Sequence, residues 1–568
     1  MEQNIMGKTV IIGGVAAGAS AAARLRRLKE DEEIILLERG AYISYANCGL
    51  PYHVGDVIQN REDLLVTKKQ VMQNRFKIDV RENNEVISID RANQTIAIRK
   101  NDGEEYQERY DNLVIATGSS PIRPRIEGID SDKVKTLWTV PDTDEIKAYI
   151  KDNNAKTAVV VGGGFIGLEM AENLHALGLK VTIVEAANQV MAPIDYEMAL
   201  LLNENIRANN VDLILGDGVA KFEDQGNAVT VSLSSGKSVT ADLVILSIGV
   251  RPNSALAKEA GLELNERGGI VVDDHMRTSD SHIYAAGDVV EVTDFVFGDK
   301  TMVPLAGPAN KQGRIVADNI AGIFSTYKGT QGSSVVKVFD LTAAATGANE
   351  KTLNRRGMVK DKDYKSIIVT QNSHAGYYPG AKPMILKLVF SMDGSKIYGA
   401  QIVGKEGVDK RIDTLGTAIR FGGSVYDLTE MELAYAPPYS SAKDPVNMLG
   451  FVAENVLAGL VEIAEWNEPD TDKEATILDV REPGELAMYS YENAINIPLG
   501  QLRGRLDELD KNKKYIVVCA IGVRAYNAAR ILKNNGYENV KVYPAGTRMY
   551  MSTHRNPDEF SQEFVCKY

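Results

Sequence analysis

AVVVGGGFIG, at residues 158–167, is the stretch of sequence that decides the fold of this chain. Four mostly β-branched apolar residues run directly into three glycines, and the helix-forming residues 168–172 follow. A G-x-G-x-x-G turn between a strand and a helix is typical of a Rossmann unit, in which the glycines let the backbone approach a pyrophosphate at the helix N-terminus. A second apolar run, residues 180–184, ends in Glu185. The pattern predicts a dinucleotide-binding βαβ unit.

A second, less complete copy of this pattern begins the chain. Residues 9–12 form a short apolar run before GGVAAG at residues 13–18, and the strand predicted at residues 33–37 ends in Glu38. Val15 replaces the second glycine of the motif, so a simple strand–turn–helix connection is the alternative. Glu38 lies about 20 residues after the last glycine, where an acid would bind a ribose hydroxyl, and this favours a cofactor. Two such units predict an α/β protein with two dinucleotides.

The acid of the second unit also bears on the choice of nicotinamide cofactor. The carboxylate of Glu185 would repel the 2′-phosphate of NADPH, and Ala186 and Ala187 supply no arginine to receive it. We therefore expect NADH rather than NADPH.

Composition limits the class of protein. The 568 residues suggest three to five domains, and the net charge of -13 argues against nucleic acid or an anionic membrane as the main partner. Residues 9–23 carry no charge but are too few to span a membrane, which takes about 20 apolar residues. The 3 cysteines, Cys48, Cys519 and Cys566, are widely spaced and form no disulfide framework. We expect a cytoplasmic protein, and we predict no metal site.

Cys48 lies in SYANCGLPY, residues 44–52, just beyond the first predicted unit. A free cysteine is most often a buried small hydrophobe. Its place beside a dinucleotide unit, in a chain with only 3 cysteines, indicates a functional role instead. If that role is thiol–disulfide exchange, which proceeds through the thiolate, the pKa of Cys48 should be lowered.

The second half of the chain changes pattern. Alternating strands are predicted from Ser334 on, and residues 462–474 are acidic and polar, as in a linker. An α/β module of about 95 residues follows, in which the strand 515–518 delivers Cys519 to a short loop before the helix 525–533. Backbone N–H groups converge on such a loop and would stabilise a thiolate or persulfide.

Several of these motifs together resemble the flavoprotein disulfide reductases, and within them the single-cysteine coenzyme A disulfide reductases that carry a C-terminal rhodanese domain and include CoA persulfide and polysulfide reductases. The resemblance rests on the paired glycine motifs, on IATG (115–118) and IYAAGD (283–288), and on SYANCGLPY. It also rests on YAPPYSSAKDPVN (435–447), on DVR (479–481), on NIPL (496–499) and on the loop closed by Arg524. Related oxidases and peroxidases commonly carry a histidine where this chain has Ala16.

The resemblance implies a domain order and an assembly. The FAD-binding domain would comprise residues 1–120 and 252–330, and the NAD(H)-binding domain residues 121–251. A dimerisation domain at 331–450, a linker at 451–474 and a rhodanese-like domain at 475–568 would follow. A homodimer with an active site shared between subunits is implied.

The resemblance also assigns residues to ligands. Cofactor-binding positions would be Gly13, Gly14, Ala16, Ala17, Glu38, Arg39, Thr117, Gly118, Gly162, Gly164, Ile166, Gly167, Glu185, Gly249, Gly287 and Asp288. Coenzyme A would contact Ser20, Arg24, Arg27, Ser44, Asn47 and Lys443. Arg24 and Arg27 are three apart and share a helix face, for which a solvated basic surface is the alternative. Either Arg75 or Lys77 would join them. A histidine that the family carries in the region of Asn310 is absent from this sequence.

The implied chemistry is the reduction of coenzyme A disulfide, CoA persulfide or polysulfide by NADH through FAD, with a mixed disulfide between Cys48 and coenzyme A. Tyr377 and Tyr435 of the other subunit would donate hydrogen bonds or protons to the leaving sulfur, and Tyr439 is a weaker candidate. Cys519 would carry sulfane sulfur as a persulfide, and Cys566 has no expected role. Two alternatives remain: an NADH oxidase or peroxidase cycling a sulfenic acid at Cys48, and a sulfane-sulfur or redox sensor.

Overall fold

The computed structural model describes residues 7–554, so Cys566 lies outside the described residues. These residues form two compact units, one comprising residues up to 186 together with 217–332, and the other comprising 187–216 together with the residues from 333 on. Within the described part of the chain, no helix is both long enough and apolar enough to cross a membrane.

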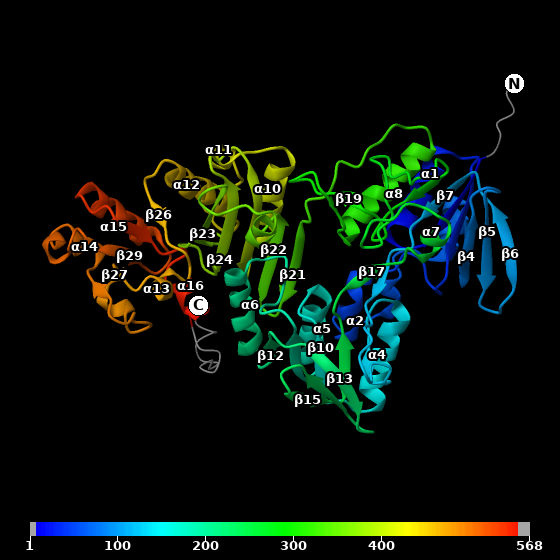
Figure 1. Cartoon of the computed structure of the whole chain (residues 1–568), viewed down its shortest axis with the longest axis horizontal. Coiled ribbons are helices and arrows are strands. Elements are labelled where there is room, and N and C mark those ends of the chain that lie inside the picture. The colour runs from blue at the N-terminus through cyan, green and yellow to red at the C-terminus, as the bar shows by residue number, and fades with distance from the viewer. Residues whose placement is uncertain (1–6, 555–568) are drawn as a thin grey trace. The chain divides into compact units, whose positions relative to one another are not determined.

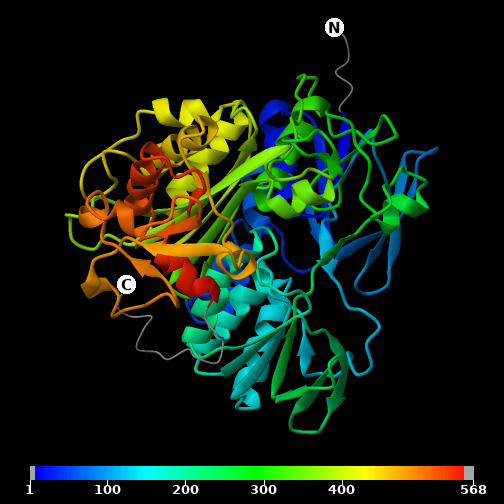
Figure 2. The same ribbon diagram turned by 60° about the vertical axis from the view of Figure 1, so that its left-hand side comes forward.

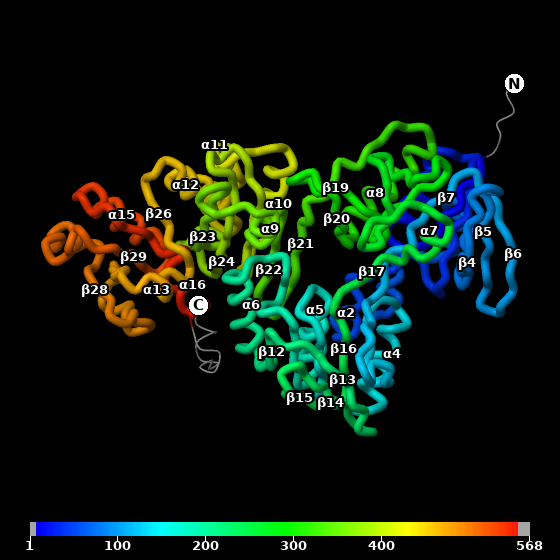
Figure 3. Tube along the Cα trace, in the orientation of Figure 1, coloured from blue at the N-terminus to red at the C-terminus, as the bar shows by residue number. Residues whose placement is uncertain are grey.

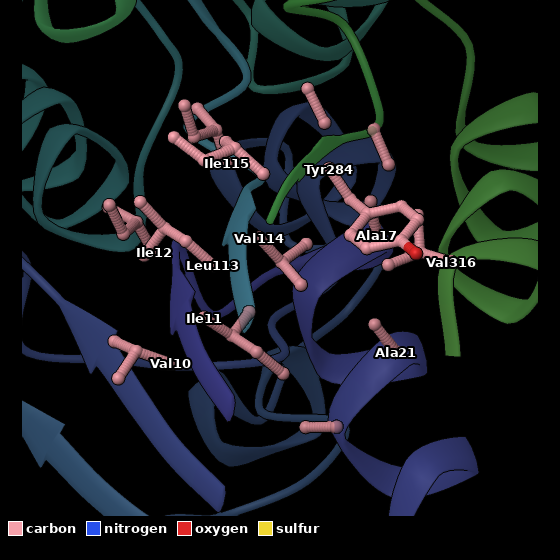
Figure 4. Packing of buried hydrophobic residues seen from close by; sticks show 14 of the residues in the cluster. Val10, Ile11, Ile12, Ala17, Ala21, Leu113, Val114, Ile115, Tyr284 and Val316 are labelled. Carbon is pink, nitrogen blue, oxygen red and sulfur yellow. The ribbon is translucent and has the colours of Figure 1, made fainter. Parts of the chain in front are cut away.

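The first unit contains a five-stranded parallel sheet in the order β18-β7-β1-β2-β3. Of this region, Figure 1 labels the strand β7 and the helices α1 and α8. Val10 and Ile11 of β1 pack with Leu113 and Val114 of β7, and α1 and α8 supply small and branched residues beside them (Figure 4). All four of these strand residues are completely buried, as expected of a parallel sheet covered by helices. The elements are β1 (Lys8–Ile12), α1 (Ala16–Leu28), β2 (Glu33–Glu38), β3 (Asp79–Glu82), β7 (Asn112–Ile115), β18 (Ile283–Ala285) and α8 (Ala306–Ile320).

The first unit also contains the parallel strands of the second predicted Rossmann unit. β11, β10, β16 and β9 lie side by side, and α5 leaves the glycine turn after β10. The elements are β9 (Val134–Lys135), β10 (Thr157–Val161), α5 (Phe165–Ala176), β11 (Lys180–Glu185) and β16 (Leu243–Leu246). Residues 187–216, within the predicted NAD segment, belong instead to the second unit, because α6 (Tyr196–Ala208) and the residue before it carry carboxylates that pair with a buried lysine there.

The second unit is built on a five-stranded antiparallel sheet in the order β21-β22-β25-β24-β23. The helix α10 packs on β22 and β25, and α12 packs on β23 and β24. Strands predicted at residues 366–370 and 383–389 are confirmed in β23 and β24. The elements are β21 (Ser334–Val338), β22 (Leu341–Gly347), β23 (Tyr364–Asn372), β24 (Pro383–Ser391), β25 (Ile397–Gly404), α10 (Val408–Arg420) and α12 (Pro445–Leu457).

A second, parallel sheet of the same unit forms the C-terminal module, in the order β26-β30-β29-β27-β28. This module, orange to red in Figure 2, lies against the antiparallel sheet, where Thr370 Oγ1 donates a hydrogen bond to the carbonyl of Ala545 at 2.9 Å. The elements are β26 (Glu462–Ile463), β27 (Ala475–Asp479), β28 (Ile495–Asn496), β29 (Lys514–Val518), α15 (Val523–Asn534), β30 (Val540–Val542) and α16 (Thr547–His554).

The structure corrects the predicted linker at residues 451–474. This segment holds the end of α12, the strand β26 and the short helix α13 (Glu468–Thr471), all labelled in Figure 3. β26 pairs with β30 in the C-terminal sheet. Val461 and Ala464 are buried, so the few apolar residues of an acidic stretch hold it in the module. The α/β class, the two Rossmann-type sheets and the antiparallel domain are confirmed.

Candidate functional site

The two glycine turns have the same backbone geometry. Gly13 and Gly162 have φ angles of +102° and +110°, which side chains rarely adopt. A Cβ atom at Gly18 or Gly167, the last glycine of each motif, would lie 1.8 or 1.9 Å from a carbonyl oxygen of the same turn. A Cβ at Gly164 would meet nothing within 4 Å, so the outer side of the second turn is open. These turns fit a dinucleotide pyrophosphate, which needs exposed N–H groups and close backbone approach.

The predicted ribose-binding acids lie against these turns. Glu38 Oε2 accepts a hydrogen bond from the Gly14 N–H at 2.9 Å, and Glu185 Oε2 accepts one from the Gly163 N–H at 2.6 Å. Arg39, next to the first acid, is exposed. The same carboxylate-to-turn contact thus occurs in both Rossmann-type sheets, at the carboxyl end of each second strand.

The other predicted cofactor residues gather at the carboxyl ends of β7 and β18. Thr117 Oγ1 donates to the carbonyl of Asn253 at 2.8 Å, which ties the end of β7 to the strand β17 (Val250–Pro252). Asp288 Oδ2 accepts from Ser119 Oγ at 2.8 Å, and burial raises the pKa of Asp288. The left-handed glycines of this region are Gly118, Gly249 and Gly287. Gly287, directly before Asp288, lies against the start of α1, because a Cβ at Gly287 would be 3.4 Å from the Cβ of Ala17.

Cys48 lies in a single 3-10 turn, Asn47–Gly49, directly before the helix α2 (Leu50–Val54). The Ser44 N–H donates to the carbonyl of Gly14 at 2.8 Å, which fixes the cysteine segment against the first glycine turn. Ser44 has a positive φ of 46°, so the chain bends sharply there. Cys48 is exposed, whereas most free cysteines are buried. The structure thus places an accessible thiol beside the first dinucleotide turn.

The expectation of a lowered pKa at Cys48 is wrong, because the surrounding protein groups raise it. Burial of part of the thiol raises its pKa, and the carboxylates of Glu169 and Asp288 raise it further. Burial disfavours the charged thiolate, and the two carboxylates repel its negative charge. The error arose because the sequence near Cys48 shows no acid, whereas the fold brings two acids from distant segments.

Glu169 is a site residue that the sequence reasoning did not single out. Tyr52 on α2 donates a hydrogen bond from its hydroxyl to Glu169 Oε1 on α5 at 3.3 Å. Burial raises the pKa of Glu169 to about 7, against a lowering contribution from the Tyr52 hydrogen bond. The sequence does show an acid at Glu169, two residues after the glycine motif. Its partner Tyr52 is far away in the sequence, so the spacing of residues could not predict their contact.

The predicted coenzyme A residues of α1 already have protein partners on α8. Ser20 Oγ donates to Asn310 Oδ1 at 2.5 Å, and Arg24 Nε contacts Asp318 Oδ1 at 2.8 Å. Arg27, on the same helix face as predicted, is exposed. Asn47 in the cysteine turn is half-buried. The Ser20 and Arg24 side chains are therefore held in place, and Arg27 is the more available cation.

The choice between Arg75 and Lys77 stays open, because both are exposed. The neighbouring Arg26, not singled out from the sequence, has a structural role instead. Its guanidinium donates to the carbonyls of Phe76 and Lys77 at 2.8 and 3.0 Å and thereby fixes the end of α3 (Lys69–Phe76) to α1.

The two predicted catalytic tyrosines, which belong to the second unit, lie together. The hydroxyls of Tyr377 and Tyr435 are 2.5 Å apart, although the residues are 58 positions apart in sequence. This hydrogen bond raises the pKa of Tyr377. Tyr439 is 73% exposed, and Lys443, also exposed, directly precedes the buried Asp444 that caps α12. Cys48 belongs to the first unit.

Cys519 follows β29 and is buried, with an exposed fraction of 1%. Its Sγ accepts hydrogen bonds from the N–H groups of Gly522 at 3.1 Å and Ala525 at 3.3 Å. The predicted convergence of loop N–H groups on this sulfur is therefore present. Gly522 makes the loop possible with a φ of +102°. On the other side of the strand end, the Thr547 N–H donates to the Cys519 carbonyl at 2.8 Å.

Arg524, which closes this loop, is bound to a carboxylate that the sequence reasoning missed. Its Nη1 and Nη2 contact Glu485 Oε2 and Oε1, both at 2.6 Å. The hydrogen bonds from Arg524 lower the pKa of Glu485 to about 2. Arg481 is likewise committed, in a buried pair with Asp479.

Comparison with protein-family models covers most of the chain. Residues 7–313 match the model described as pyridine nucleotide-disulphide oxidoreductase, and residues 333–445 match the dimerisation domain of the same group. Residues 463–552 match the rhodanese-like domain. This last match begins within β26, in agreement with the structural limits of the C-terminal module.

Similar proteins and structures carry consistent descriptions. Coenzyme A disulfide reductase of Staphylococcus epidermidis is 36% identical over 451 residues, which are 79% of this chain and all of that protein. A crystal structure of reduced Bacillus anthracis CoADR-RHD is 50% identical, with a TM-score of 0.93 over 96% of this chain and 98% of that one. A NAD-dependent persulfide reductase from A. fulgidus is 40% identical, with a TM-score of 0.91 over 96% of this chain and 100% of that one.

Proposed function

Because the chain belongs to the pyridine nucleotide-disulphide oxidoreductase family, we propose that it is an NADH-dependent reductase of coenzyme A disulfide, CoA persulfide or polysulfide. The observation that carries this proposal is the exposed Cys48, tethered through Ser44 to the first glycine turn. Cys519, the other described cysteine, is buried in the rhodanese-like module, so the partner sulfur of Cys48 is that of a small molecule. The descriptions of the similar proteins support coenzyme A as that molecule.

Cys48 is the nucleophile in this proposal. Its thiolate attacks one sulfur of coenzyme A disulfide, so that a mixed disulfide forms and one coenzyme A leaves as a thiolate. FAD and NADH, when bound, supply the two electrons that convert the mixed disulfide back to the Cys48 thiolate and a second coenzyme A. The raised pKa of Cys48 means that a proton must leave the thiol before attack. The charge of Glu169, whose pKa is about 7, opposes this ionisation, so the thiolate forms more readily when Glu169 is protonated.

Tyr377 and Tyr435 supply the proton for the leaving coenzyme A sulfur, and a homodimer presents them to the Cys48 of the partner chain. The match to the dimerisation domain supports this assembly. The hydrogen bond between the two hydroxyls supports a shared proton, because one tyrosine can hold the other in a donating orientation. Arg27 and Lys443, both exposed, are the cations assigned to coenzyme A phosphates.

Cys519 transfers sulfane sulfur between persulfides. Its thiolate attacks the outer sulfur of a persulfide R–S–SH, the S–S bond of the donor breaks, and R–S⁻ leaves while Cys519 holds the persulfide. The N–H groups of Gly522 and Ala525 support an anion at this sulfur.

The proposal is tested by following NADH oxidation with coenzyme A disulfide as substrate. The wild-type protein should consume one NADH per disulfide, and Cys48→Ser should lose this activity while it still binds FAD. Cys519→Ser should retain it. Full turnover by Cys48→Ser would refute the role of Cys48, and oxygen consumption equal to NADH loss without any sulfur substrate would favour an oxidase.

A further inference from the structure

Glu485 binds the arginine that closes the Cys519 loop. Arg524 is the guanidinium nearest to this cysteine along the loop, and the Cys519 sulfur contributes to its raised pKa. Both terminal nitrogens of Arg524 are taken by the Glu485 carboxylate at 2.6 Å. A bidentate pair of this kind neutralises the cation and fixes its orientation.

The other charged groups around the loop do not restore a positive field. Arg481 is buried and paired with Asp479, with Nη2 to Oδ2 at 2.6 Å. Glu482 also acts on Arg524 and leaves the site with a further negative charge. Arg548, on α16, is half-buried and interacts with Glu204 of α6. Arg524 and Arg481 are therefore both paired with a carboxylate, and Arg548 has Glu204 as an electrostatic neighbour.

The rim of the loop is apolar. Ile521 and Val523, on either side of Gly522, are 44% and 49% exposed. These exposed branched side chains favour a sulfur donor whose reacting end is uncharged and partly apolar. A dianion would lose its hydration water at this rim and would find Arg524 and Arg481 already paired.

We propose that Glu485 is a specificity-determining residue, which makes the Cys519 site accept persulfides on an uncharged arm, such as the pantetheine end of CoA persulfide, and reject the dianion thiosulfate. This inference rests on the proposed function of Cys519 as a sulfur carrier. In the disfavoured reaction, the Cys519 thiolate would take the outer sulfur of thiosulfate and release sulfite. Glu485 acts through Arg524 and does not touch the donor.

The experiment compares two donors, CoA persulfide and thiosulfate, with cyanide as acceptor and thiocyanate as the measured product. Wild-type protein should prefer CoA persulfide. Glu485→Gln should raise the ratio of kcat/KM for thiosulfate to that for CoA persulfide by about tenfold or more, because Arg524 becomes available to the dianion. The thiosulfate activity of this variant should fall as salt is added, since the new attraction is screened.

Glu508→Gln is the matched control. Glu508 forms an exposed bidentate pair with Arg505 in the same module, at 2.7 Å for both contacts, so its substitution removes the same charge away from Cys519. It should leave the donor ratio unchanged. An unchanged ratio in Glu485→Gln, or a wild-type protein that uses thiosulfate as well as CoA persulfide, would overturn the inference. NADH-dependent reduction of coenzyme A disulfide, measured in parallel, reports separately on the proposed function of Cys48.

Discussion

Tyr52 and Glu169 join the helix after the reactive cysteine to the helix after the second glycine turn, through a hydrogen bond of 3.3 Å from the tyrosine hydroxyl to Oε1. The contact is supported by close packing of the two helices, because a Cβ at Gly55 would lie 2.1 Å from the Asn173 side chain. The two helices therefore meet at a titrating carboxylate close enough to Cys48 to raise its pKa.

Glu169 should control the reactivity of Cys48. With its pKa at about 7, Glu169 is ionised in the range where Cys48 titrates, so its charge opposes the thiolate. Glu169→Gln removes that charge and should lower the pKa of Cys48. The rate of alkylation by iodoacetamide at pH 7.5 should rise by about three- to tenfold. Glu172→Gln, one turn further along α5, should change the rate little, and a slower reaction of Glu169→Gln would contradict the electrostatic account.

The Tyr377–Tyr435 pair should be needed for turnover with coenzyme A disulfide. Tyr377→Phe or Tyr435→Phe removes one hydroxyl of the hydrogen-bonded pair and should lower kcat by about 10²-fold, the size of a general-acid contribution. Tyr378→Phe is the matched control, because Tyr378 is exposed and its ring contacts His374 instead. Equal losses for Tyr378→Phe and Tyr377→Phe would show that the loop, and not the hydroxyl pair, matters.

Glu185 should set the preference for NADH. Its carboxylate accepts from the Gly163 N–H at 2.6 Å and so lies at the glycine turn, where a 2′-phosphate would meet it. Glu185→Gln should raise kcat/KM for NADPH relative to NADH by about tenfold, since a like-charge repulsion is removed. Glu223→Gln, which removes an exposed carboxylate paired with Lys221 in the same sequence segment, should leave the ratio unchanged. A wild-type protein that prefers NADPH would refute the assignment.

Lys387 should be a major source of stability in the second unit. It is completely buried on β24, where burial alone would lower its pKa, but Glu197, Asp195 and Glu350 together raise it well above its ordinary value. Lys387→Met leaves three carboxylates without their shared cation and should lower the free energy of unfolding by about 3–5 kcal/mol.

Trp466 can report this unfolding, because its ring lies 5.9 Å from that of Tyr196 on α6. Urea denaturation followed by its fluorescence, in a Trp138→Phe background, gives the midpoint. Lys365→Met on the neighbouring strand breaks only the partly exposed pair with Asp361 and should cost about 1 kcal/mol or less. Similar midpoints for the two lysine variants would contradict the role given to the buried cluster.

The sequence by itself determined the fold class and the two glycine turns. A G-x-G-x-x-G between an apolar run and a helix leaves few alternatives, because a Cβ at Gly167 would lie 1.9 Å from a carbonyl oxygen. The loop of Cys519 was equally readable, since the order strand, cysteine, glycine and helix dictates which N–H groups converge on the sulfur. These are local constraints of backbone geometry.

Only the tertiary structure decided the electrostatics and the partners. Glu169 and Asp288 come from distant segments to raise the pKa of Cys48, against the sequence expectation, and Glu485 lies 39 positions from the Arg524 that it neutralises. The assignment of Asp195 and Glu197 to the second unit likewise depends on a lysine 190 positions from Glu197. Spacing along the chain fixes which backbone groups meet in a turn, whereas packing of distant elements fixes which charges share a low-dielectric space.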